Sequence, residues 1–132
     1  MRHYLLDTNT VSHALRGHSK VLARMTAVPM ASLGISAITE GELLFGLARR
    51  PEAVKLQALV EEFLRRVDVL PWDRNCAARY GPLRAAMGER GRTLAPLDLL
   101  IAAHAQSLDA VLVSNDKAFS QCEGLAWEDW SA

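Results

Sequence analysis

Short apolar runs recur along the chain, and each is bounded by polar residues, glycine or proline. Runs of this kind are typical of buried β-strands. The pattern predicts strands over residues 3–6, 33–36, 67–70 and 110–113, and a fifth at the sheet edge over 125–127. A small β-sheet is therefore expected at the centre of the protein.

Between these runs, apolar residues return every three or four positions, the spacing of a helix with one buried face. Helices are predicted over residues 11–16, 20–27, 37–48, 52–66, 74–87 and 96–108. Ser36 and Asp73 are suitable N-caps, and Pro96 suits a first helical position. Pro82 is expected to kink or divide the helix that contains it, because proline lacks the backbone N–H group.

Strands that alternate with helices predict a particular layered architecture. We expect an α/β fold in three layers, with a mostly parallel sheet of four or five strands and helices on both faces. No repeat, low-complexity tract or charged tail divides the sequence, so residues 1–132 are expected to form one domain. In such folds, sites form beyond the carboxyl ends of the strands.

Composition narrows the class of protein. Hydrophobic residues make up 50% of the chain, and 15 basic side chains balance 15 acidic ones. This composition supports a real core, and zero net charge argues against a general nucleic-acid coat protein. Apolar runs are too short for a membrane span and no secretory signal is recognisable, so a cytoplasmic location without membrane association is expected. Cys76 and Cys122 are expected to be reduced structural thiols.

Acidic residues follow the predicted strands at suggestive positions. Asp7 comes directly after the first strand, and Asp116 follows the fourth with two residues between. Glu42 and Asp98 lie in helices that can lean over the same edge of the sheet, although Glu40 competes with Glu42 on periodicity alone. Each aspartate has a simpler interpretation as a helix cap, and Glu42 could face solvent.

If these carboxylates share one cleft, their mutual repulsion favours a bound cation. Oxygen ligands without a histidine or cysteine cluster favour Mg²⁺, with Mn²⁺ as a substitute. One or two such ions can polarise a phosphodiester and activate a water molecule. The acids therefore suggest metal-dependent hydrolysis of phosphodiester bonds, and the number of ions is left open.

Four segments in the order of the chain carry a family resemblance. They begin at Leu5-Leu6-Asp7-Thr8-Asn9, at Ser36-Ala37-Ile38-Thr39-Glu40-Gly41-Glu42, at Gly91-Arg92-Thr93-Leu94-Ala95-Pro96-Leu97-Asp98 and at Val111-Leu112-Val113-Ser114-Asn115-Asp116. Together they resemble the PIN-domain ribonucleases, and within them the VapC-type toxins of VapBC toxin–antitoxin systems. Pro82 departs from the family's pattern in its helix.

The resemblance implies an endoribonuclease that depends on Mg²⁺ or Mn²⁺ and acts as the toxin of a type II toxin–antitoxin pair. Asp7, Glu42 and Asp98 match the family's acidic triad, which selects Glu42 over Glu40. Asp116 matches a less uniform fourth position, and Ser114 stands where a hydroxyl can hold a metal-bound water. A cognate VapB-like antitoxin and a homodimer are further expectations; the RNA target, transfer RNA or another RNA, is left open.

Arginines near the predicted cleft are the natural candidates for RNA phosphate contacts. Arg92 is the first choice by position, followed by Arg49, Arg50 and Arg84, and solvent-exposed helix positions are the alternative for each. Trp72, Trp127, Trp130 and His104 are expected to pack in the core or at its edge rather than to bind bases or metal.

Two other functions fit parts of the pattern. A phosphatase with an aspartyl-phosphate would need an Asp-x-Asp motif, and Asp7-Thr8-Asn9 lacks the second acid. A PIN-like scaffold without activity would be expected to have lost acids, whereas Asp7, Glu42 and Asp98 are all present.

Overall fold

The computed structural model describes residues 2–132; Met1, the first residue of the predicted domain 1–132, lies outside the described residues. Its strands are β1 (Tyr4–Leu6), β2 (Leu33–Ser36), β3 (Asp68–Leu70), β4 (Val111–Val113) and β5 (Trp127–Glu128). They form one sheet in the order β3-β2-β1-β4-β5, and every strand pairs in parallel with its neighbour. The predicted α/β class is confirmed, although the edge strand β5 lies further along the chain than expected.

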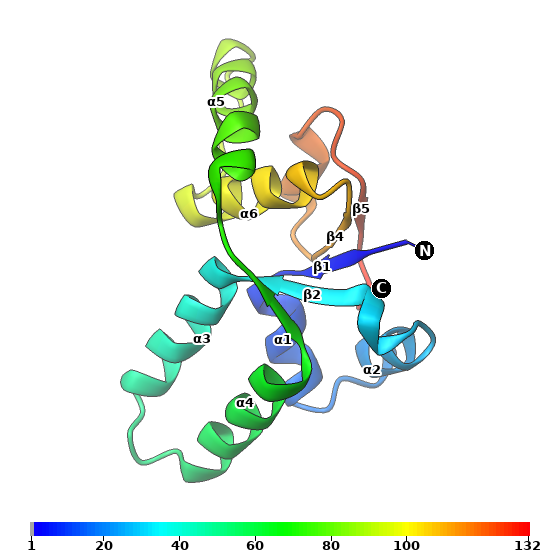
Figure 1. Cartoon of the computed structure of the whole chain (residues 1–132), viewed down its shortest axis with the longest axis vertical. Coiled ribbons are helices and arrows are strands. Elements are labelled where there is room, and N and C mark those ends of the chain that lie inside the picture. Colours follow the sequence, from blue (N-terminus) through cyan, green and yellow to red (C-terminus); the bar gives the residue numbers. More distant parts are fainter. Residues whose placement is uncertain (1) are drawn as a thin grey trace.

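Helices cover both faces of this sheet (Figure 1). They are α1 (Thr8–Leu15), α2 (Ser19–Thr26), α3 (Ala37–Ala48), α4 (Val54–Arg66), α5 (Arg74–Glu89) and α6 (Pro96–Ser107), with short 3₁₀ turns η1 (Met30–Ser32) and η2 (Lys117–Gln121). In Figure 1, α1 to α4 lie on one side of the strands and α5 and α6 on the other. The expected three layers are therefore present.

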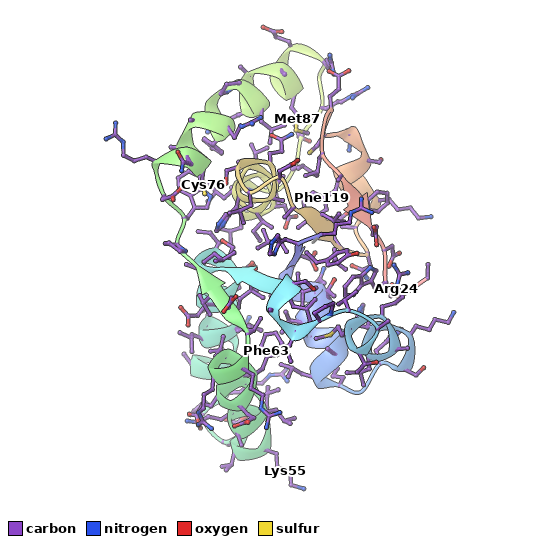
Figure 2. The ribbon with its side chains drawn as sticks, turned by 45° about the vertical axis from the view of Figure 1, so that its right-hand side comes forward. Arg24, Lys55, Phe63, Cys76, Met87 and Phe119 are labelled. Carbon is purple, nitrogen blue, oxygen red and sulfur yellow. The ribbon has the colours of Figure 1, made fainter. Side chains whose placement is uncertain are left out.

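Alternation along the strands divides the core into two parts. Leu5 and Leu112 are buried against α5 and α6, whereas Leu6 and Val113 are buried with residues of α1 to α4. Successive strand side chains point to opposite faces, so each strand contributes to both parts. Figure 2 shows Phe119 on the side of the sheet that α5 and α6 cover. Burying both faces fixes the register of these short strands.

Helix α5 shows that one of the two outcomes expected at Pro82, a division of the helix, is wrong. Pro82 lies inside α5, and the helix runs undivided from Arg74 to Glu89. Proline removes one intrahelical hydrogen bond, but α5 packs along α6, where Leu83 and Met87 are buried in the core. Tertiary packing therefore maintains the helix across Pro82.

The expectations about the caps, Pro96 and the two cysteines are confirmed, whereas Leu59, Leu97 and Leu108, expected on buried helix faces, are exposed. Ser36 and Asp73 cap α3 and α5, and Pro96 is the first residue of α6. Cys76 and Cys122 are buried free thiols. In the described chain, residues 2–132, no helix is both long enough and apolar enough to span a membrane.

Candidate active site

Asp7 leaves the carboxyl end of β1 and is almost completely buried, with 4% of its surface exposed. Its Oδ1 accepts a hydrogen bond of 2.8 Å from the Thr10 backbone N–H and so caps α1. Burial raises the pKa of this carboxyl, and hydrogen bonds from Ser114 and Thr10 only partly oppose the increase. Asp7 is thus held rigidly at the end of a central strand, in a setting that disfavours its charge.

Glu42 lies on α3, on the face turned toward α1. The Thr8 hydroxyl donates a 2.6 Å hydrogen bond to Glu42 Oε1, and the Thr39 hydroxyl lies 3.4 Å from that of Thr8. Thr8 is the first residue of α1, and its side chain reaches across to α3.

Asp98 lies in the first turn of α6 and makes no cap there, because the N-cap residue is Ala95. Burial and then the charges of Asp116, Asp7 and Glu42, in that order, together raise its pKa from the ordinary value of 3.8 to about 6. Each of these influences disfavours the charged form. Four acids from separate segments therefore share one electrostatic environment, and Glu40 is not among those that affect Asp98.

Asp116 follows β4 and caps the short turn η2. Its Oδ1 accepts a 2.9 Å hydrogen bond from the Ala118 backbone N–H, and its own N–H donates to Ser114 Oγ at 3.0 Å. Ser114 is fully buried between Asp7 and Asp116. The capping interpretation thus applies to Asp7 and Asp116, each through Oδ1.

The donors of this site fit a hard divalent cation. They are carboxylate and hydroxyl oxygens, and every influence on the pKa of Asp98 is one that a bound cation would offset. Among residues 2–132, however, no three acidic, histidine or cysteine side chains already lie close enough together to form a metal-binding cluster. Without a cation between them, like charges separate. The four acids are therefore near enough to raise the pKa of Asp98 but are not gathered as a ready-made ligand set.

Arg92 lies outside this group of acids, in the loop between α5 and α6. Its guanidinium donates a 3.1 Å hydrogen bond to the Gln121 carbonyl. It lines a depression together with Arg84, Pro96 and other residues at the start of α6. Arg92 thus flanks the N-terminal end of the helix that contains Asp98.

A buried link between α6 and α3 also supports the site. His104 is 1% exposed, and its Nδ1 lies 2.8 Å from Ser36 Oγ, which accepts from the Ile38 N–H at the start of α3. Burial lowers the pKa of His104, which favours the neutral ring. The prediction of a packed histidine is confirmed. Its bond to Ser36 was not predicted, because it joins residues that are distant in the sequence and leave no local pattern. The Thr8–Glu42 bond was missed for the same reason.

Replacing Thr8 by valine removes the hydroxyl at nearly constant volume and leaves Glu42 Oε1 without its donor. Residues that orient metal ligands typically affect metal affinity ten- to a hundredfold. We expect Thr8→Val to weaken Mn²⁺ binding by about tenfold or more, measured by calorimetry, whereas Thr8→Ser should bind nearly as tightly as the unmodified protein. Equal Mn²⁺ affinities for the valine and serine variants would contradict this role.

Mn²⁺ affinity should also depend on pH through Asp98. Its raised pKa means that the folded, metal-free protein holds a proton between pH 3.8 and about 6 that the unfolded chain releases. Metal must displace this proton, so Mn²⁺ affinity should rise from about pH 5 to about pH 7 with measurable proton release. The stability of the metal-free fold should fall as the pH rises from 3.8 to about 6. Asp98→Asn should make both profiles shallower, leaving the part that comes from the raised pKa of Asp7; unchanged profiles would refute the assignment.

Comparison with known proteins places these features in context. The family model described as "PIN domain" matches residues 4–125. The chain is 31% identical to the tRNA(fMet)-specific endonuclease VapC of Shigella flexneri, over 99% of this chain and 100% of the relative. It is 33% identical to ribonuclease VapC1 of Haemophilus influenzae strain R2866, over 97% and 98% of the two chains.

Solved structures show the same likeness over the whole fold. The DNA-bound VapBC of Salmonella typhimurium contains a chain that superposes with a TM-score of 0.91 at 32% identity, covering 98% of this chain and 99% of that one. VapBC2 of Rickettsia felis, bound to a promoter DNA fragment, gives a TM-score of 0.87 at 30% identity, covering 96% and 98%. Both structures are toxin–antitoxin complexes by name.

Proposed function

Because the chain belongs to the PIN-domain family and to the VapC ribonucleases within it, we propose that it is a metal-dependent endoribonuclease. In this proposal it acts as the toxin of a type II toxin–antitoxin pair. Mg²⁺ is the proposed cofactor, and Mn²⁺ substitutes for it.

One observation supports the proposal above the others. Asp98 has a pKa of about 6 because burial and the charges of Asp116, Asp7 and Glu42 all act against its ionisation. A protein gains nothing in stability from gathering acids in this way. Strongly shifted carboxylates at the carboxyl edge of a parallel sheet are instead typical of a functional site.

Asp7, Glu42, Asp98 and Asp116 would hold the metal, which when bound polarises a phosphodiester and makes water a better nucleophile at neutral pH. The protein's own residues fix the positions of these acids. The caps on α1 and η2 orient Asp7 and Asp116, and Thr8 orients Glu42. No hydrogen bond is among the influences that shift the pKa of Asp98, so its carboxylate is available to the cation.

Partners follow from the same family assignment. We propose a VapB-like antitoxin as the inhibitor, RNA as substrate with transfer RNA as one candidate, a homodimer as the assembly and the cytoplasm as the location. Arg92 is a proposed phosphate contact at the start of α6, with Arg84 beside it on the same surface.

Incubation of the purified protein with total RNA and Mg²⁺ or Mn²⁺ tests the function directly. We expect discrete cleavage products. They should not form after EDTA has removed the metal, and they should form again when Mn²⁺ is added. Mapping the new RNA ends would identify the target.

Other outcomes would select another function. Hydrolysis of a phosphomonoester without RNA cleavage would favour the phosphatase interpretation. RNA or protein binding without cleavage, at any tested metal concentration, would favour an inactive PIN-like scaffold. Either result would contradict the proposed ribonuclease.

A further inference from the structure

A groove between α1, α3 and α4 begins beside the candidate active site. Thr8 and Glu42 line it together with Arg16, Arg49 and Arg50. Arg16 is the C-cap residue of α1, and Arg49 is that of α3. Since a helix rises about 1.5 Å per residue, these arginines lie roughly 10–12 Å along the helices from Thr8 and Glu42. In Figure 1, α1 and α3 both lead away from the sheet.

The charges in this groove are unbalanced. Glu42 is the one acid that lines it, against three arginines. Elsewhere in residues 2–132 some arginines pair with acids, as Arg65 and Arg66 do with Glu62 and Arg90 does with Glu123, and others do not, namely Arg74, Arg79, Arg84 and Arg92. None of the groove's arginines forms an ion pair within this described part of the chain. On a chain with no net charge, this is a local excess of positive charge.

Helix capping accounts for only part of this pattern. A basic residue at a helix C-terminus is favoured by the helix dipole, which explains Arg16 and Arg49 individually. It explains neither Arg50, which follows the cap of α3, nor why α1 and α3 both direct their arginines into one groove. A ligand with several negative charges accounts for all three positions.

The position of the groove indicates which ligand this is. An RNA strand with one phosphate at the acids must continue away from them, and the groove starts at Glu42. Successive phosphates present repeated single charges, and the planar guanidinium group binds phosphate through two parallel hydrogen bonds. An apolar wall lies between the charges, against which sugars and bases can lie; it is formed by Leu15, Leu43 and Leu47.

We propose that Arg16, Arg49 and Arg50 bind phosphates of the RNA substrate on one side of the cleavage point. This inference rests on the proposed ribonuclease function and specifies the path of the substrate through that site. It adds Arg16, which sequence reasoning did not select, and places the groove's arginines on the opposite flank of the acids from Arg92.

Salt dependence of RNA binding tests the proposal. For single strands, the slope of log K against log salt changes by about 0.7 for each phosphate contact. Replacing Arg16, Arg49 and Arg50 by glutamine should therefore lower the slope by about 2 and weaken the binding of a labelled single-stranded RNA by about tenfold or more. The matched control replaces Arg65, Arg66 and Arg79, which removes the same charge away from the groove, and should change the slope by less than about 0.7.

Cleavage by the unmodified protein, measured in parallel, separates the possible results. If that protein cleaves RNA but the groove variant keeps the original slope, the proposed path is wrong and the ribonuclease function stands. If the groove variant keeps its slope but no longer forms a complex with the product of the adjacent gene, the groove binds a protein instead. If the unmodified protein neither binds nor cleaves RNA, the function and the path both fail. Thermal melting of both variants checks that the fold is intact.

Discussion

Asp98→Asn should reduce metal-dependent RNA cleavage by at least about a hundredfold, because a bound metal supplies several kcal/mol of transition-state stabilisation. The same change should make the metal-free protein more stable above about pH 6. Asparagine is nearly the size of aspartate but has no charge to be repelled by Asp116, Asp7 and Glu42. Opposite effects on activity and stability are typical of a residue retained for function.

The second variant to compare is Asp7→Asn, which removes another acid of the site but keeps a helix cap. Asparagine is also a good N-cap, so Asp7→Asn should keep the hydrogen bond from Thr10 and the start of α1. It should lose RNA cleavage to a similar extent. Activity and thermal melting, each measured at about pH 5 and about pH 8, test both variants. Full activity in both, or a loss of stability for Asp98→Asn at high pH, would contradict the role of these acids.

Trp130→Ala should destabilise the fold by about 3–5 kcal/mol, the usual cost of removing a buried large aromatic side chain. Trp130 is 2% exposed, and its ring centroid lies 5.1 Å from that of Tyr4 on β1. Its Nε1 donates to Glu128 Oε1, which also accepts from Arg24 on α2. Trp130 therefore joins the C-terminal segment to both β1 and α2.

Urea unfolding measures this loss, and Trp130→Phe is the matched control. Phenylalanine keeps most of the apolar surface and loses the hydrogen bond, so we expect a cost of about 1–2 kcal/mol. If Trp130→Ala kept its stability and lost RNA affinity, Trp130 would instead be a base-stacking residue.

The central strands were predictable because their sequences are short, apolar and clearly bounded. Residues 33–36 were expected as a strand, and β2 spans Leu33–Ser36. The edge strand β5 was placed too early, because its Glu128 is polar and pairs with Val113 only through the backbone. Apolar pattern alone does not locate a strand of this kind.

The candidate site was predictable in its residues but not in its internal contacts. Asp7 and Asp116 follow strands, so the parallel sheet alone places them at one edge. The bond from Thr8 to Glu42 depends instead on how α1 packs against α3. The groove that contains Arg16 likewise depends on three helices, α1, α3 and α4, meeting in space. Such contacts arise from tertiary packing and leave no local pattern in the sequence.

A crystal soaked in Mn²⁺ tests the central claim, that these acids form one metal site, most directly. Anomalous scattering should locate manganese between Asp7, Glu42 and Asp98. The carboxylates should have moved together, so that each coordinating oxygen lies about 2.0–2.2 Å from the ion. Asp116 should lie in the same site, either as a ligand or through a bound water. Manganese bound elsewhere, or the three carboxylates remaining apart at saturating Mn²⁺, would contradict the account.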